Sequence, residues 1–196
     1  MTRSLDEVHD LIDTWKIDPA METLRPATRL LATMAVGDPG RIDVLLVIAD
    51  HQSMRGEVDD ALATLDGAAG EPGADADLLM ATRIAYLIDA GRTDQADPLL
   101  RDLRRRAADL PIDGIERVAE ALEQRGRLRE AMRWFTIALR DLDPSRDLPE
   151  PDEEDALIGR WRIREQLELP ADHYDSLARE TLELRRTRWT DTDWSG

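Results

Sequence analysis

The chain has 196 residues, 42 Asp and Glu against 26 Lys and Arg, a formal net charge of −16, and no cysteine. This composition excludes a disulfide-stapled fold, a thiolate metal site and a cysteine nucleophile. It also argues against nucleic-acid binding, which needs positive charge to displace counterions. The longest apolar run, Val44–Ala49, is far shorter than the roughly 20 residues that span a bilayer, and no signal-peptide core is present. We therefore expect a soluble, cytoplasmic protein that does not contact membranes.

Residues 1–39 are predicted to form a pair of helices that caps the fold. Ser4 and Glu7 match the capping-box pattern, and apolar residues follow at helical spacing as far as Trp15. A second helix is expected to include Ala27 and Met34 and to end before the glycine- and proline-containing residues 37–40.

Residues 41–144 are predicted to contain three repeats of about 35 residues. Four columns recur at a spacing of 35: Gly56, Gly91 and Gly126; Ala61, Ala96 and Ala131; Leu65, Leu100 and Phe135; and Ala68, Leu103 and Ala138. Each repeat predicts two antiparallel helices around a glycine turn, with the apolar positions on one face of the second helix. Pro98 is expected to disrupt the second helix of the middle repeat.

A two-helix repeat of this length with this glycine turn resembles the tetratricopeptide repeat family. The stretches Gly56–Ala61 and Gly126–Ala131 are similar to the family's turn and second-helix start, and Phe135, Ala138 and Pro144 continue the match. The family's first-helix Trp and Tyr are missing, and helical-hairpin repeats of other families stay open as an alternative. The resemblance implies an all-α fold of antiparallel helix hairpins stacked in a right-handed superhelix, an α-solenoid of eight to ten helices within a single domain of residues 1–196.

The C-terminal part departs from the repeat. Residues 143–155 are acidic and contain three prolines, which predicts an exposed linker. Two further helices are expected over residues 156–187, followed by a polar tail at residues 188–196. Gln166 stands where the next repeat alanine would fall, so the period is lost.

No catalytic, metal-binding or cofactor-binding motif is found. His9, His51 and His173 are isolated, and the run Asp152–Asp155 lacks the alternation and glycine of a calcium loop. A phosphate loop, a nucleophile elbow and a dinucleotide fingerprint are also absent from the sequence. We therefore expect no catalytic residues, no metal and no cofactor, and a protein that is not an enzyme.

One candidate binding surface follows from the repeat register. By analogy with tetratricopeptide arrays, first helices line the concave side, so their positions not needed for packing are candidates. They are Asp43, Leu46 and Asp50; Asp89 together with Leu78, Ala81 and Ala85; and Asp113, Glu116, Glu120 and Glu123. This set predicts a groove that is apolar in its middle and acidic at one end, suited to a basic or amphipathic peptide. The alternative is that these acids are only solvated.

The favoured hypothesis is a non-catalytic interaction scaffold or adaptor for a protein or peptide partner, without nucleic acid. Two alternatives stay open: a regulatory domain or subunit of an enzyme, and a self-associating module that forms a homodimer through the ends of its helical stack. Trp134, beside Phe135, is expected to point off the packed face of its helix, either at a junction between repeats or on the outer surface, where it is a candidate contact residue.

Overall fold

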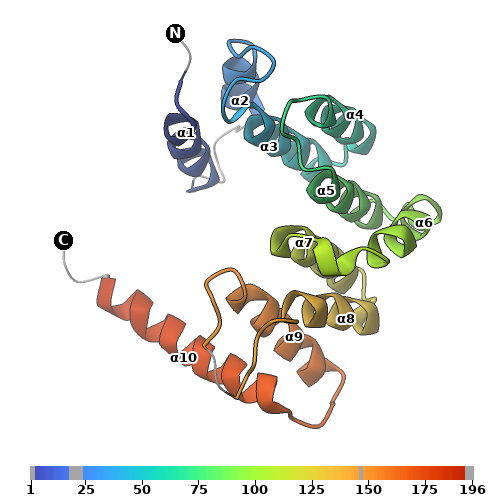
Figure 1. Ribbon diagram of the computed structural model, residues 1–196, viewed down its shortest axis with the longest axis vertical. Helices are drawn as coiled ribbons and strands as arrows, with labels where there is room; N and C mark the ends of the chain where they lie inside the picture. Colours follow the sequence, from blue (N-terminus) through green and yellow to red (C-terminus); the bar gives the residue numbers. More distant parts are fainter. Residues whose placement is uncertain (1–2, 18–23, 146–147, 193–196) are drawn as a thin grey trace. The chain divides into compact units, whose positions relative to one another are not determined.

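The computed structural model describes residues 3–17, 24–145 and 148–192, and within them it contains ten α-helices, one 3₁₀ turn and no strand (Figure 1). In chain order these are α1 (Leu5–Ile17), α2 (Leu24–Leu31), α3 (Arg41–Met54), α4 (Val58–Ala69), α5 (Ala76–Asp89), α6 (Thr93–Arg104), η1 (Ala107–Asp109), α7 (Ile112–Gln124), α8 (Leu128–Ala138), α9 (Glu154–Gln166) and α10 (His173–Thr192). The predicted all-α fold of eight to ten helices is confirmed. The chain divides within α6 into two compact units, Met1–Ala96 and Asp97–Gly196, and each is described by itself. The single domain and the handedness of the stacking stay predictions.

Three helix-to-helix turns share one hydrogen-bond pattern. Gly56, Gly91 and Gly126 have φ angles of 78°, 72° and 72°, a left-handed conformation that glycine adopts without a steric cost. At the first turn, the Gly56 N–H donates to the Ser53 carbonyl at 2.9 Å, and the next N–H, of Glu57, donates to the Gln52 carbonyl at 2.9 Å. The same two bonds recur at the other two turns, with lengths of 2.8 to 2.9 Å. This is the Schellman motif, and it confirms the turns predicted from the glycine column.

A fourth turn of the same kind joins α9 to α10, with Glu168 in the glycine position. Its φ is 52°, its N–H donates to Glu165, and the Leu169 N–H donates to Arg164, each at 3.1 Å. Glu168 follows Gly126 by 42 residues instead of 35, because the segment between α8 and α9 is long and separates this hairpin from the one before it. The series of helix hairpins therefore continues beyond the point where the sequence period is lost.

Glu168→Gly is expected to raise the free energy of unfolding by about 0.5–1 kcal/mol. The left-handed conformation costs a residue with a Cβ about 1–2 kcal/mol, and the backbone entropy of glycine offsets part of that gain. Urea denaturation followed by circular dichroism measures the change. The matched control is Gln166→Gly, two residues earlier and inside α9, which should lower stability. A loss of stability in Glu168→Gly would contradict the prediction.

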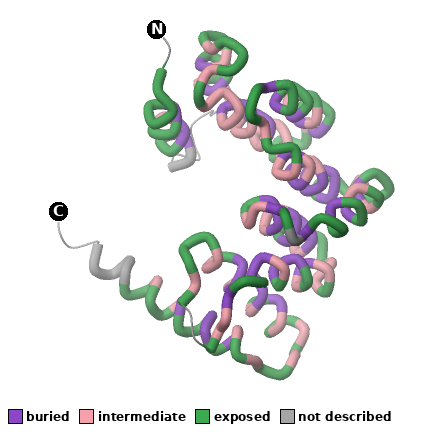
Figure 2. The backbone as a smooth tube through the Cα atoms, viewed as in Figure 1, coloured by how far each residue is buried: buried purple, intermediate pink, exposed green. Residues whose placement is uncertain are grey.

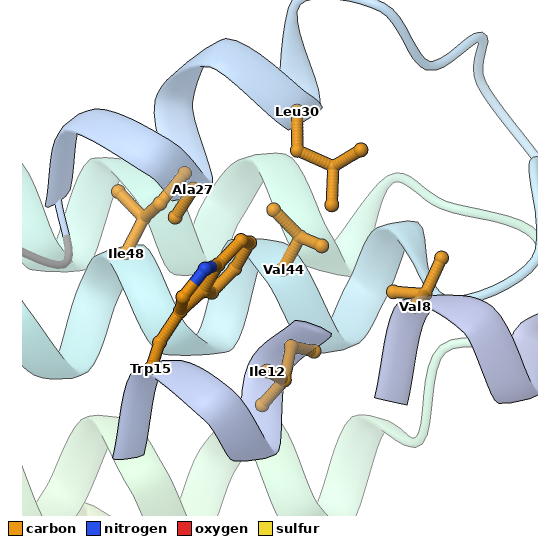
Figure 3. Close-up of a cluster of buried hydrophobic side chains, with 7 residues drawn as sticks. All are labelled: Val8, Ile12, Trp15, Ala27, Leu30, Val44 and Ile48. Atoms are coloured by element: carbon orange, nitrogen blue, oxygen red, sulfur yellow. The ribbon is translucent and has the colours of Figure 1, made fainter. Parts of the chain in front are cut away.

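The first unit is built on two apolar clusters that share α3. In the first cluster, α1 packs against α2 and α3 (Figure 3), through Val8, Ile12, Trp15, Ala27, Leu30, Val44 and Ile48. The predicted capping box at the start of α1 is confirmed, because Ser4 N–H donates to Glu7 at 2.9 Å and Glu7 N–H to Ser4 Oγ at 3.2 Å. In the second cluster, Ala49 and Ala61 are fully buried between α3 and α4. Their small side chains allow these two helices to approach closely.

The second unit packs α7 against α8, α8 against α9 and α9 against α10. Its buried positions lie where these helices face one another (Figure 2), and they include Ala119 on α7 and Ala131 and Phe135 on α8. Two expectations are corrected. Of the two places expected for Trp134, the outer surface is wrong, because the side chain is only 3% exposed and the face of α8 that carries it is covered as well. Helix α6 runs through Pro98, which is exposed, so water can hydrate the carbonyl that loses its helical partner.

The end of the chain also differs from the expected tail. Helix α10 continues to Thr192, into the segment expected to be polar tail. Residues 193–196 of that expected tail lie outside the described residues.

Gly159→Ala is expected to lower the free energy of unfolding by about 1–3 kcal/mol through overpacking. A Cβ on Gly159 of α9 would lie 2.6 Å from Cζ of Phe135, a ring that is only 1% exposed and cannot move aside freely. The control is Gly67→Ala in α4, where a Cβ would meet nothing within 4 Å and should add stability through helix propensity. Thermal or urea unfolding should show that Gly159→Ala lowers stability and Gly67→Ala raises it. A change of the same sign in both variants would contradict the close approach of α9 to Phe135.

Candidate functional site

A cavity of about 310 Å³ opens in the first unit between the start of α3 and the start of α5. Leu46, Leu78 and Leu79 give it apolar walls, and the loops that precede the two helices complete it. Asp43 and Leu46 are two of the residues predicted for the groove, and the fold brings them together here with Leu78. The cavity lies at the low end of the size range of ligand pockets, with room for one or two side chains.

An ion pair between Arg41 and Glu71 holds the two loops of this cavity together. The Nε–H of Arg41 donates to Glu71 Oε1 at 2.7 Å, and its Nη1 donates to the carbonyl oxygens of Met34 at 2.9 Å and Leu31 at 3.2 Å. The other oxygen of Glu71 accepts the Gly37 N–H at 2.8 Å. The Gly37 N–H and the Arg41 guanidinium hold the pKa of Glu71 below its usual value although burial opposes them. Glu71 is therefore a charged, buried support of the cavity.

Three more carboxylates line the cavity, and each has a local role. Asp75 caps α5 by accepting the N–H groups of Asp77 and Leu78 at 2.9 and 3.0 Å. Asp38 accepts the Ala35 N–H at 2.8 Å, and Asp43 lies 3.3 Å from the His9 ring. Since the one guanidinium of the lining is already paired with Glu71, these three carboxylates give the cavity an excess of negative charge.

The other predicted residues of this unit lie elsewhere. Asp50 accepts the Tyr86 hydroxyl at 2.6 Å and so links α3 to α5 as a structural contact. Ala81 and Ala85 are 0% and 3% exposed and belong to the core, which corrects their assignment to an open groove. Asp89 is exposed at the last residue of α5, outside the cavity lining.

The remaining four predicted residues lie on α7 in the second unit. Asp113 and Glu120 are exposed, whereas Glu116 and Glu123 are half-buried. Glu123 is neutralised by Arg162 of α9, whose Nε and Nη2 donate to its two oxygens at 2.7 and 2.6 Å. The fold thus places Glu116, Glu120 and Glu123 beside α9, while Asp113 stays in the exposed first turn.

The carboxylates of α7 are crowded. Burial, followed by the nearby carboxylates of Asp155, Glu120 and Asp113, raises the pKa of Glu116 to about 7, while the Ala156 N–H opposes the rise. One oxygen of Glu116, Oε1, is buried without a hydrogen-bond partner among the described residues. Burial and Asp155 also raise the pKa of Glu120. Negative charge is therefore in excess at this face, even with Arg162 present.

Glu116→Gln is expected to raise the free energy of unfolding near neutral pH by about 1 kcal/mol, a value discounted because the side chain is partly solvated. The folded protein holds the Glu116 proton up to about pH 7, whereas the unfolded chain releases it near its ordinary pKa of 4.5. Wild-type stability should therefore fall as the pH rises through this window and become constant above it.

Urea midpoints measured across this pH window test the prediction. The Gln variant should lose the component of the slope that Glu116 contributes, and the exposed control Glu180→Gln should keep it. An unchanged slope in Glu116→Gln would show that the crowding of these carboxylates has no energetic effect.

Arg41, Glu71 and Asp75 build the cavity but were not predicted from the sequence. Asp75 had a local signal, because an Asp before an apolar helical segment is a typical N-cap. Arg41 and Glu71 had none, since they are 30 residues apart and meet only when α3 and α4 pack side by side.

The described part of the chain contains neither a metal-binding cluster nor a helix suited to a membrane. No group of three or more His, Asp or Glu side chains within it is arranged to hold a metal ion. Within the same residues, no helix combines the length and the apolar character needed to cross a membrane.

Comparisons with known proteins show a likeness to solved structures but not to a described family. No protein-family model matches the chain, and no curated protein matches it. Among solved structures, the chain is similar to MamA AMB-1, at 20% sequence identity and a TM-score of 0.45. The similarity covers 85% of this chain and 96% of the MamA chain. The all-α hairpin fold is established by the helices and turns themselves.

Proposed function

We propose that the protein is a non-catalytic, tetratricopeptide-like interaction scaffold that binds a basic, amphipathic segment of a partner protein. The observation that carries this proposal is the cavity between α3 and α5, with its leucine walls and its excess of carboxylates. An aliphatic side chain would fill the apolar part, and a neighbouring Arg or Lys would reach Asp43 at the rim. Complementary charge of this kind favours the choice of partner and its association rate.

The crowded face of α7 supports the same class of partner. A cationic side chain beside Glu116 and Glu120 would relieve the repulsion that raises their pKa values. Binding of a basic segment there would therefore be coupled to release of the Glu116 proton and would strengthen as the pH rises through about 7. Glu123 contributes less, because Arg162 already occupies it.

The test uses a short synthetic peptide that alternates Arg and Leu, titrated calorimetrically into the full chain. Asp43→Arg reverses one charge on the cavity without touching its structural carboxylates, Glu71 and Asp75. We expect at least about tenfold weaker binding, which corresponds to about 1.4 kcal/mol. The matched control, Asp10→Arg, makes the same change at an exposed position of α1 outside the cavity and should bind within about twofold of the wild type.

The pair of variants separates a local site from a general charge effect. Equal losses in Asp43→Arg and Asp10→Arg would mean that the peptide responds only to the net charge, and the proposed cavity site would be wrong. A separate variant, Glu120→Arg, tests whether the face of α7 also takes part.

A further inference from the structure

A small notch in the second unit has the opposite charge from the surfaces above. It has a volume of about 50 Å³, and it is lined by Leu100, Arg101 and Arg104 of α6 and by Glu130, Arg133, Trp134 and Ile137 of α8. Leu100 and Trp134 are buried and Ile137 is half-buried, whereas the three arginines are exposed. We call this feature the arginine notch. It combines a small apolar lining with three guanidinium groups around it.

The arginines of the notch differ from several other described arginines of this unit in having no acidic partner. Among the described residues, Arg101, Arg104 and Arg133 make no ion pair, whereas Arg127, Arg160 and Arg185 of the same unit each meet at least one carboxylate. The one acid that lines the notch, Glu130, is already held by Arg127, whose Nε and Nη2 each donate to it at 2.8 Å. In a chain with 16 excess negative charges, three clustered and unpaired guanidinium groups form a local site of positive charge.

We infer that the arginine notch is a second binding site, which takes an acidic peptide segment carrying a short aliphatic side chain between its carboxylates. Guanidinium groups present planar pairs of donors that match carboxylates in two-point contacts. The apolar lining between them has room for about one small side chain. The inference does not depend on the proposed function, since it concerns other residues and a ligand of opposite charge.

The surroundings favour a peptide over a nucleic acid. A polyanion would feel the net charge of −16 along its whole length, while a short peptide meets mainly the three arginines. Proteins that hold single strands also stack bases on exposed aromatic faces. Trp134 is only 3% exposed, so its ring is not available as such a platform.

The probe is a rhodamine-labelled octapeptide of the sequence Glu-Asp-Leu-Glu-Glu-Leu-Asp-Glu, and binding to the full chain is followed by fluorescence anisotropy. In the triple variant R101Q/R104Q/R133Q, Kd should rise at least about tenfold. The matched control R3Q/R29Q/R125Q removes the same charge from three other exposed arginines and should change Kd by less than about twofold. Circular dichroism checks that each variant keeps its helices.

A second variant guards against misfolding. R101K/R104K/R133K keeps every charge but loses the paired donors, so its Kd should lie between those of the wild type and the Gln variant. The inference is overturned if the wild type does not bind the peptide, or if the notch variant R101Q/R104Q/R133Q and its control lose the same amount of affinity for it. It is also overturned if a short oligothymidylate binds more tightly than the peptide and loses binding in the notch variant.

Discussion

Asp175→Ala is expected to lower the free energy of unfolding by about 3–5 kcal/mol, the usual cost of removing one partner from a buried charge network. Asp175 lies in the first turn of α10 and is 2% exposed. Its two oxygens accept from Arg164 Nε at 3.1 Å each, and the Arg160 guanidinium lies 3.5 Å away. Without Asp175, two poorly solvated guanidinium groups would share Asp172 alone.

The same substitution removes half of the cap of α10, because the Asp172 N–H loses its acceptor while Asp172 itself remains. Asp172 N–H donates to Asp175 at 2.9 Å, and Asp175 N–H donates to Asp172 at 3.1 Å, so the two residues form a reciprocal capping box. Burial opposes ionisation of Asp172, but the hydrogen bond and charge of Arg160 hold its pKa below the usual value. A group with a lowered pKa stabilises the fold above about pH 4, and this contribution is lost as the pH falls.

Urea denaturation is the suitable measurement, because guanidinium chloride would screen the charges. Asp175→Asn keeps the shape and the backbone contact but not the charge, so its loss should be smaller, about 2 kcal/mol. The exposed control Asp152→Ala should change stability by less than about 0.5 kcal/mol. Equal stability of Asp175→Ala and the wild type would show that the network does not hold α9 and α10 together.

Glu71→Ala is expected to cost about 3 kcal/mol and to abolish peptide binding in the cavity between α3 and α5. The substitution leaves the Gly37 N–H without its acceptor and takes the carboxylate from Arg41, whose side chain is only 18% exposed. The two loops that line the cavity then lose their common anchor. Urea denaturation measures the loss of stability, and calorimetric titration with the peptide of alternating Arg and Leu measures the loss of binding.

Glu71→Gln separates the charge from the shape of this anchor. Its amide oxygen can still accept from Gly37, so we expect a loss of about 1–2 kcal/mol. The lowered pKa of Glu71 implies that its stabilising effect is present above about pH 4.5 and lost as the pH falls. The difference between wild type and Glu71→Gln should therefore shrink in acid, and a constant difference would contradict the prediction.

Much of the fold could be predicted because its signals are local. The glycine after a helix determines only the turn beside it, and Ser4 caps only the helix that it precedes. The turns and the capping box of α1 could therefore be predicted from the sequence. The turn at Glu168 was not, since glutamate has no preference for a left-handed conformation and only the packing of α9 and α10 imposes it.

The candidate site was harder to predict, because its contacts join residues that are far apart in the sequence. Asp50 meets Tyr86, Glu71 meets Gly37, and Glu123 meets Arg162, at separations of 36, 34 and 39 residues. Helical register indicates the face on which a carboxylate lies, but not whether a partner one repeat away neutralises it. That is why Asp43 lines a cavity while Asp50 and Glu123, which are also carboxylates on the face predicted for the groove, are occupied by structural contacts.

The cations that pair with Glu71, Glu123, Asp172 and Asp175 are all arginines. Arginine keeps its proton at any pH at which a protein is ordinarily handled, whereas a lysine in the same place would begin to lose its charge near about pH 10. These ion pairs can therefore be broken by acid, through their carboxylates, but not by base. The fold should tolerate alkaline solution far better than acid.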